Sequence, residues 1–144
     1  MIEISGNIFN VSENIVITTN GNIKKNGEAV MGKGLALKAA KLIPTLPKIL
    51  GDKLLDGNNV YYLGQFDKFI GVFNFPTKHN WWEKSDLQLI LRSCKQLIEL
   101  VNIMQIPKII LPRPGCGFGQ LSWNKTIKPA IENLFDDRFS VISL

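Results

Sequence analysis

The sequence contains few residues of the types that build metal centres or disulfide frameworks. Among its 144 residues there are two cysteines, Cys94 and Cys116, and one histidine, His79. Cys94 falls within a helical pattern and Cys116 between two loop glycines, so their spacing indicates neither a metal site nor a disulfide. We therefore expect no bound metal and no cofactor, and a reducing, cytoplasmic location.

Long hydrophobic runs are also absent. No stretch approaches the roughly 20 apolar residues of a membrane span, and Met1–Ile4 lacks the basic-then-apolar pattern of a signal peptide. Hydrophobic residues nevertheless make up 45% of the chain and charged residues 20%, which favours a packed core over disorder. The length fits one domain over residues 1–144, and we expect a monomer with no membrane contact.

The charge balance is basic, with 17 lysine and arginine residues against 12 aspartate and glutamate residues and a net charge of +5. Such a balance favours an anionic ligand or contact with nucleic acid through a basic surface. The lysines are scattered rather than grouped, and many proteins with no nucleic-acid partner have a similar charge. The composition alone therefore leaves both interpretations open.

Hydrophobic periodicity predicts strands and helices that alternate along the chain. Strands are expected at Met1–Ile4, Asn14–Thr19, Val60–Gly64, Phe69–Phe75, Lys108–Leu111 and Phe139–Ser143. Helices are expected at Gly34–Ile43, Thr45–Leu55, Asp86–Met104 and Trp123–Phe135. The third and fourth strands should form a hairpin that turns near Asp67. This order predicts an α/β fold of three layers, in which a mixed sheet lies between helices.

Two helix starts carry recognisable signals. Ser85 and Gln88 match a capping box before the long helix Asp86–Met104. Ser122 is expected to cap the last helix, and Pro129 should kink that helix or start it afresh.

Two glycine-rich loops each follow a predicted strand. In the first, Gly27, Gly32 and Gly34 lead into a helix; in the second, Gly115, Gly117 and Gly119 fall at alternate positions. Glycines let the backbone N–H groups turn toward one point, and a helix N-terminus favours an anion. In α/β folds, ligands bind at the carboxyl ends of strands. Two such loops predict a ligand with more than one phosphate group.

Four further positions each allow more than one interpretation. Asn20 could hold a pair of sugar hydroxyls or form an Asn-Gly turn. Lys78 could clamp a phosphate, attack a carbonyl or anomeric carbon, or simply be solvated. His79 could move protons near neutral pH or lie on a surface loop. Cys116 could be a nucleophile or a small loop residue.

The aromatic residues near these loops are equally open to interpretation. Trp81 and Trp82 could cover the site as stacking surfaces or pack their loop against the domain. Phe118 could contact a ligand sugar or base, or anchor its loop to the core.

In combination, the motifs resemble the macro domain, an ADP-ribose-binding module, over nearly the whole chain. The resemblance rests on Asn20, Gly27–Ala36, Asn74–Lys78 and Pro112–Trp123. Within that family, the segments Val30–Ala36, Asn74–Lys78 and Pro114–Gly117 are similar to the branch that contains the terminal ADP-ribose protein glycohydrolase and the DNA ADP-ribosyl glycohydrolase antitoxin. The resemblance implies a six-stranded mixed sheet with ADP-ribose bound over the strand ends.

The resemblance also implies roles for individual residues. Asn20 would hold the distal ribose, and Lys78 would attack its C1″ atom to form a covalent intermediate. Apart from the resemblance, His79 is the second candidate catalytic residue, as a group that could move protons. The ligand-binding residues would be Asn7, Ile8, Asn20, Met31, Gly32, Gly34, Leu35, Pro114, Gly115, Cys116, Gly117, Phe118 and Gly119.

The sequence departs from the family pattern at two of these positions. Asn7 replaces the aspartate that usually contacts the adenine, and Gly119 replaces an acid that the protein glycohydrolase carries in its phosphate loop. The DNA-directed antitoxins lack that acid, so the second departure favours them.

The function expected from these features is removal of ADP-ribose from DNA or protein through a lysine nucleophile. Two alternatives stay open: a phosphatase acting on ADP-ribose-1″-phosphate, and a non-catalytic reader of ADP-ribose. The expected partners are ADP-ribose itself and ADP-ribosylated DNA or protein.

Overall fold

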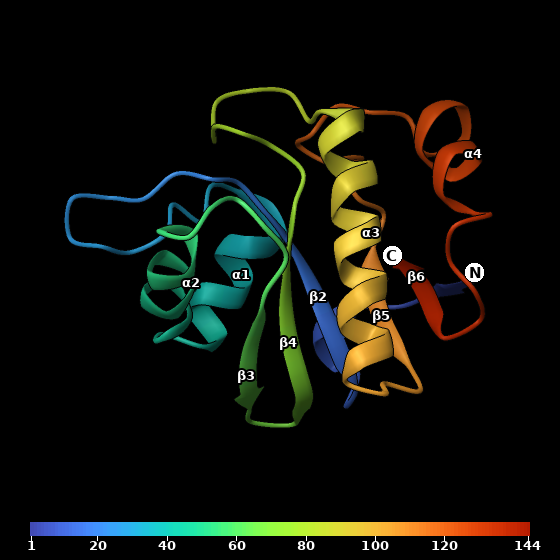
Figure 1. Cartoon of the computed structure of the whole chain (residues 1–144), viewed down its shortest axis with the longest axis horizontal. Helices are drawn as coiled ribbons and strands as arrows, with labels where there is room; N and C mark the ends of the chain where they lie inside the picture. The colour runs from blue at the N-terminus through green and yellow to red at the C-terminus, as the bar shows by residue number, and fades with distance from the viewer.

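The computed structural model describes residues 1–144 and contains one six-stranded sheet (Figure 1). The strands lie in the order β1-β6-β5-β2-β4-β3, and only β3 runs antiparallel to its neighbour. Their bounds are β1 Ile2–Ser5, β2 Asn14–Thr19, β3 Tyr62–Phe66, β4 Phe69–Pro76, β5 Ile109–Pro112 and β6 Phe139–Ser143. The predicted mixed sheet is confirmed, as is the β3–β4 hairpin, which turns at Asp67 with φ 49°.

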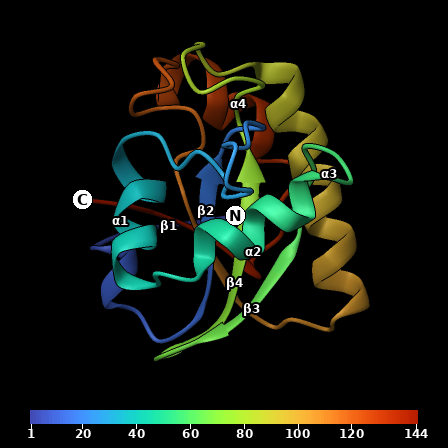
Figure 2. The ribbon, with the colours of Figure 1, turned by 90° about the vertical axis from the view of Figure 1, so that its left-hand side faces the viewer.

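Helices cover both faces of the sheet, as the three-layer prediction requires (Figures 1 and 2). The helices α1 (Gly34–Leu42) and α2 (Leu46–Leu54) pack on one face, and α3 (Leu87–Ile103) and α4 (Lys128–Ile131) on the other. The central strand β2 contributes side chains to both hydrophobic cores: Val16 packs in the core under α3, and Ile15 and Ile17 pack in the core under α1 and α2. The continuous β-branched run of β2 is therefore buried on both sides.

The two predicted helix starts have different outcomes. A short 3-10 helix, η1 (Ile8–Asn10), follows β1, and a π-helical turn, η2 (Trp123–Ile127), precedes α4. Ser122 caps η2 as predicted by accepting a hydrogen bond from the amide of Lys125, and Pro129 lies in the first turn of α4. The capping box at Ser85 is wrong, because Asp86 caps α3 by accepting from the amide of Gln88 at 2.9 Å. The helix starts one residue later than predicted, and Ser85 is buried instead.

Three loops meet at one edge of the sheet because they follow neighbouring parallel strands. Residues 20–33 follow β2, residues 77–86 follow β4, and residues 113–122 follow β5. This edge lies at the top of Figure 1 and carries the ligand-binding features that the sequence predicts.

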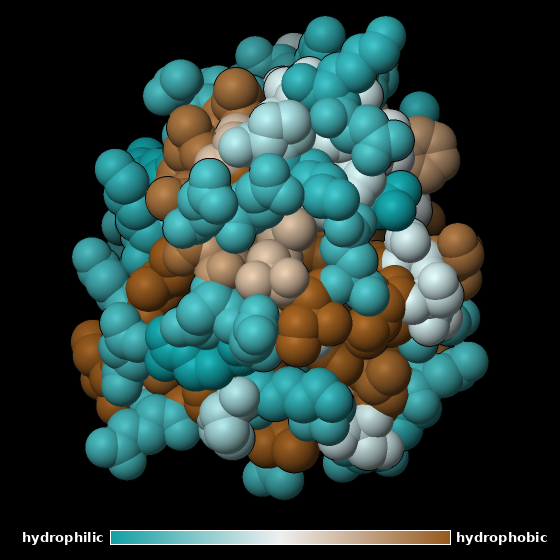
Figure 3. Space-filling model, turned by 90° about the vertical axis from the view of Figure 1, so that its right-hand side faces the viewer, coloured by the Kyte–Doolittle hydropathy of each residue, from teal (hydrophilic) through white to brown (hydrophobic).

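Viewed from the side of α4 and β6, apolar residues form several groups separated by hydrophilic ones (Figure 3). No helix combines the length and the apolar composition needed to cross a membrane.

Candidate functional site

A cavity of about 890 Å³ opens at the carboxyl ends of β2, β4 and β5, between the three loops. Its size suits a nucleotide-sized ligand. The structure brings ten of the predicted site residues to its wall. They are Asn20, Met31, Gly32, Gly34, Leu35, Lys78, Gly115, Gly117, Phe118 and Gly119.

Asn20 is buried at the base of the first loop and holds the shape of that loop. Its Oδ1 atom accepts a hydrogen bond from the amide of Asn22 at 2.9 Å, and its Nδ2 atom donates to the carbonyl of Val30 at 2.9 Å. The first bond is an Asx turn, so the turn interpretation of Asn20 is confirmed. The second Nδ2 hydrogen has no protein acceptor in the structure and is available to a ligand at the cavity wall.

The first loop ends at an uncapped helix. Gly34 begins α1 with φ 62°, a backbone conformation that favours glycine, and the preceding Lys33 makes no side-chain hydrogen bond to the first turn. The amides of this turn are therefore open to the cavity side, together with the positive end of the helix dipole. This arrangement can hold an anion.

The second glycine loop is tightly folded around Ser85. The amide of Ser85 donates to the carbonyl of Gly119 at 3.1 Å, and the amide of Leu121 donates to the carbonyl of Gly115 at 2.9 Å. A Cβ atom at position 119 would overlap Ser85 Oγ and lie 2.5 Å from the Gly115 carbonyl oxygen. The loop therefore has no room for the acid that the protein glycohydrolase carries at this position.

Phe118 connects the two glycine loops across the cavity. A Cβ atom at Gly34 would lie 2.9 Å from Cδ2 of Phe118, and Nζ of Lys33 lies 5.8 Å from the centre of the ring. The side chain is 62% exposed, so it does not anchor its loop to the core. Its position favours contact with a ligand.

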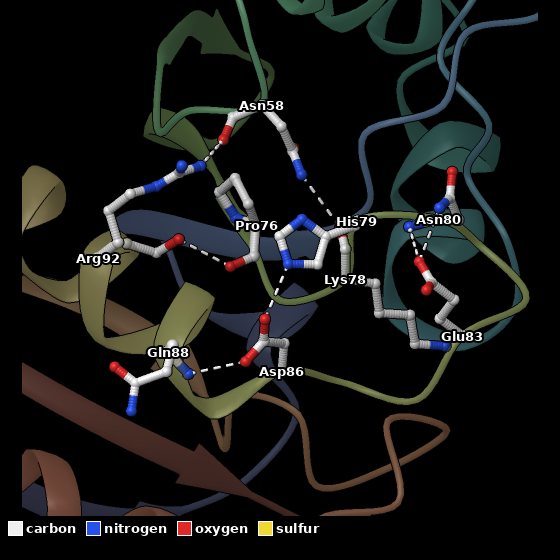
Figure 4. Close-up of polar contacts among 10 residues, drawn as sticks. Asn58, Pro76, Lys78, His79, Asn80, Glu83, Asp86, Gln88 and Arg92 are labelled. Carbon is white, nitrogen blue, oxygen red and sulfur yellow. Dashed lines mark hydrogen bonds and ion pairs between the residues drawn. The ribbon is translucent and has the colours of Figure 1, made fainter.

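Lys78 lies on the third loop, whose backbone is fixed from several directions (Figure 4). The amide of Thr77 donates to Thr19 at 3.0 Å, and the carbonyl of Thr77 accepts from Asp86 at 2.9 Å. The Lys78 carbonyl accepts from Nδ2 of Asn58 at 3.1 Å. The Lys78 side chain is half-buried at the cavity wall and forms no ion pair or hydrogen bond in the structure.

His79 points away from Lys78 and toward α3 (Figure 4). Its Nε2 atom lies 2.8 Å from Oδ2 of Asp86, and its carbonyl accepts from the amide of Gly21 at 3.1 Å. The hydrogen bond from His79 is the main cause that lowers the pKa of Asp86, with a further contribution from the amide of Gln88. His79 does not line the cavity, so its contacts support a role in holding the loop rather than direct proton transfer.

The two tryptophans of the same loop lie at the rim of the cavity. Trp81 is 48% exposed and Trp82 is 65% exposed, and their ring centres are 5.8 Å apart at an angle of 90°. Neither indole belongs to the hydrophobic core. The interpretation in which they cover the site is therefore the one that their exposure favours.

Four further predicted residues lie outside the cavity wall. Asn7 is exposed and caps η1 by accepting from the amide of Phe9, while Ile8 is a core residue. Pro114 is buried, and the half-buried thiol of Cys116 faces the carbonyl of Pro114 at 3.5 Å. Burial raises the pKa of Cys116 to about 11, which is unfavourable for a nucleophile.

Several residues of the cavity wall were not predicted from the sequence. Charged side chains from all three loops line the wall at Lys24, Glu28, Glu83 and Arg113, and the buried hydroxyl of Ser85, which has no hydrogen-bond partner, lies there too. Arg113 follows β5 directly between two prolines, a position that could have identified it. Lys24 and Glu28 have no such local signal. No group of three or more histidine, cysteine, aspartate or glutamate side chains is arranged to hold a metal ion.

Sequence comparison finds relatives with an established name, although no family model matches the chain. A DNA ADP-ribosyl glycohydrolase of Thermus aquaticus is 30% identical over 118 residues, which cover 76% of this chain and 33% of that protein. The enzyme of the same name from Mycobacterium tuberculosis is 31% identical over 104 residues, or 68% of this chain and 30% of the relative. The chain spans about a third of the length of the curated relatives it matches.

Solved structures match over almost the whole chain. The macrodomain of M. tuberculosis DarG has a TM-score of 0.78 and 27% identity, and the macrodomain of T. aquaticus DarG has a TM-score of 0.76 and 26% identity. Each match covers 99% of this chain and 97% of the other. Thermosipho africanus DarTG in complex with ADP-ribose has a TM-score of 0.76 and 19% identity, covers 95% of this chain and 39% of that one, and shows likeness of fold alone.

Proposed function

Because the chain belongs to the macro domain family, in the branch of the DNA ADP-ribosyl glycohydrolases, we propose that it binds ADP-ribose and removes it from ADP-ribosylated DNA. The observation that carries this proposal is the cavity in which two glycine loops and Lys78 meet. The names of the relatives support DNA as the carrier of the ADP-ribose group.

Main-chain amides would bind the diphosphate of ADP-ribose. The uncapped start of α1 and the Gly115–Gly119 loop offer N–H groups from two sides of the cavity. Basic side chains in the wall outnumber acidic ones, with Lys24, Lys33, Lys78 and Arg113 against Glu28 and Glu83. The free Nδ2 hydrogen of Asn20 would orient the distal ribose.

Lys78 would act as the nucleophile. Its neutral amine would form a bond to C1″ of the distal ribose while the bond from C1″ to the DNA base breaks, and the base would leave with the electron pair and take up a proton. Water would then attack C1″, release the Lys78 amine and yield ADP-ribose. The fixed backbone around Lys78 leaves only its side chain to move during these steps.

Two measurements test this function. Calorimetric titration with ADP-ribose should show binding at one site per chain. In parallel, the protein should be incubated with ADP-ribosylated single-stranded DNA, ADP-ribosylated protein and ADP-ribose-1″-phosphate, and ADP-ribose release should be fastest from the DNA. Binding without release from any of the three would favour a reader, and release from the phosphate compound alone would favour the phosphatase.

A further inference from the structure

We propose that Trp81 and Trp82 form a stacking site for an unpaired base of single-stranded DNA, beside the base that carries ADP-ribose. This inference rests on the proposed function for the identity of the strand. It adds a second binding element at the rim of the cavity, which would recognise the DNA rather than the ADP-ribose group.

The exposure of the two indoles is the first observation. The chain has three tryptophans, and Trp123 shows how this fold accommodates one that is structural: it is 6% exposed and its Nε1 atom donates to Glu3 at 3.0 Å. Trp81 and Trp82 are 48% and 65% exposed, although burying an indole would stabilise the fold. Adjacent large aromatic rings left in water are typical of a binding surface.

The second observation is that the exposed rings stand on a well-fixed loop. The amide of Trp81 donates to Oδ1 of Asn22 at 2.7 Å, and Nδ2 of Asn22 donates to Oδ1 of Asn80 at 2.9 Å. Oε1 of Glu83 accepts from both the amide and the side chain of Asn80 at 2.8 Å. Binding would therefore cost little conformational entropy in the backbone that carries the rings.

The perpendicular arrangement of the rings suits a planar partner. Their centres are 5.8 Å apart at 90°, so one ring presents its edge to the other and the pair does not stack face to face. A free indole face is the surface on which a nucleobase stacks. A base paired in a duplex has both faces covered by its neighbours, which is why we specify a single strand.

Charge favours a nucleic acid over other partners. Lys24, Lys33 and Lys78 line the same cavity and none of them forms an ion pair in the structure. The chain as a whole carries a net charge of +5. Cationic side chains interleaved with aromatic rings provide contacts for both the phosphates and the bases of a strand.

Tryptophan fluorescence provides a test that needs no turnover. An unmodified single-stranded oligonucleotide of about ten nucleotides should quench the emission of the wild-type protein, because stacking affects the two exposed indoles. The double variant W81A/W82A retains only buried Trp123, and the same titration should leave its emission unchanged. Equal quenching by the duplex of the same sequence, or quenching by poly-glutamate but not by the oligonucleotide, would overturn the proposal.

Kinetics then separate recognition of DNA from binding of ADP-ribose. Trp82→Ala should reduce kcat/KM for an ADP-ribosylated oligonucleotide by about 5- to 150-fold, the range for loss of one base–aromatic stack, and by clearly less for an ADP-ribosylated mononucleotide. Trp82→Phe should recover part of the loss. Ile103→Ala, at the opposite end of α3 and also exposed, is the matched control and should change neither rate.

The two proposals fail in different ways. A wild-type protein that neither binds nor releases ADP-ribose would contradict the proposed function, while the fluorescence titration would still decide the role of the tryptophans. Equal losses on the oligonucleotide and the mononucleotide in Trp82→Ala would overturn the stacking site and leave the proposed function intact.

Discussion

His79 and Asp86 are joined by a 2.8 Å contact between Nε2 and Oδ2, and the other carboxylate oxygen of Asp86 caps α3 (Figure 4). One carboxylate therefore connects the loop that carries Lys78 to the first turn of the longest helix. The amide of Asp86 adds a third connection by donating to Thr77 at 2.9 Å. The position of Lys78 thus depends on a residue that does not line the cavity.

Removal of this carboxylate should destabilise the protein by about 1 kcal/mol, the usual value of an N-cap. Asp86→Ala should show this loss in urea unfolding at pH 7. The lowered pKa of Asp86 in the folded state means that its carboxylate stabilises the fold above the unfolded pKa of about 3.9, and that this contribution is lost as the pH falls through the folded value. The difference in the free energy of unfolding between Asp86→Ala and wild type should therefore narrow below about pH 4. The exposed Asp52→Ala is the control and should stay within about 0.5 kcal/mol at pH 7.

The second glycine loop provides a matched pair of substitutions. Gly119→Ala would bring its Cβ atom into overlap with Ser85 Oγ and close to the Gly115 carbonyl. We therefore expect the free energy of unfolding to fall by about 1–3 kcal/mol and ADP-ribose to bind more weakly. A Cβ atom at Gly117 would meet nothing within 4 Å, and Gly117→Ala should preserve the melting temperature. Thermal unfolding of the two variants measures the difference, and equal stabilities would contradict the loop geometry.

The fold could be predicted from the sequence because its signals are local. The bounds of β2 follow from a continuous segment rich in β-branched residues and those of β6 from a short segment rich in apolar residues, and Ser122 caps its helix as expected. The cap of α3 could not be predicted, because Ser85 and Asp86 are both good capping residues and tertiary packing buried the first of them under the glycine loop.

The site was predictable only where its residues follow strands. The glycine loops and Lys78 could be placed because they come directly after β2, β5 and β4. Asn58 could not, because it precedes β3 and reaches the Lys78 carbonyl only through the folded arrangement. Sequence likewise could not show that the imidazole of His79 points toward α3, since only the folded loop fixes that direction.

Both thiols should be inert in the folded protein. Burial raises the pKa of Cys116 to about 11 and that of Cys94 to about 12, so both are thiols rather than thiolates at neutral pH. Iodoacetamide at pH 7.5 should label neither cysteine until urea unfolds the chain, as measured by intact-mass spectrometry. Rapid labelling of native Cys116 would contradict this prediction and favour the interpretation of Cys116 as a nucleophile.

Asn20 is expected both to stabilise its loop and to bind the ligand. Asn20→Asp keeps the acceptor for the amide of Asn22 but loses the donor to Val30, whereas Asn20→Ala loses both bonds. We expect both variants to be less stable than wild type, the alanine variant by about 1–3 kcal/mol because it loses both bonds, and the aspartate variant because it places a buried carboxylate oxygen against the Val30 carbonyl. Both variants should bind ADP-ribose more weakly in calorimetry, since neither has the free N–H. Asn26→Ala, on the exposed part of the same loop, is the control.

Lys78 provides the decisive test of the proposed chemistry. Lys78→Ala should still bind ADP-ribose, because the amides of the two glycine loops remain, but should lose turnover by at least about 10³-fold if the amine forms the bond to C1″. Lys84→Ala removes a lysine from the same loop that does not line the cavity and should keep full turnover. Lys78→Arg keeps the positive charge but has no nucleophilic amine, so it separates a clamp on the phosphates from a nucleophile. Turnover close to wild type in the arginine variant would show that charge at this position is sufficient, and the covalent step would have to be abandoned.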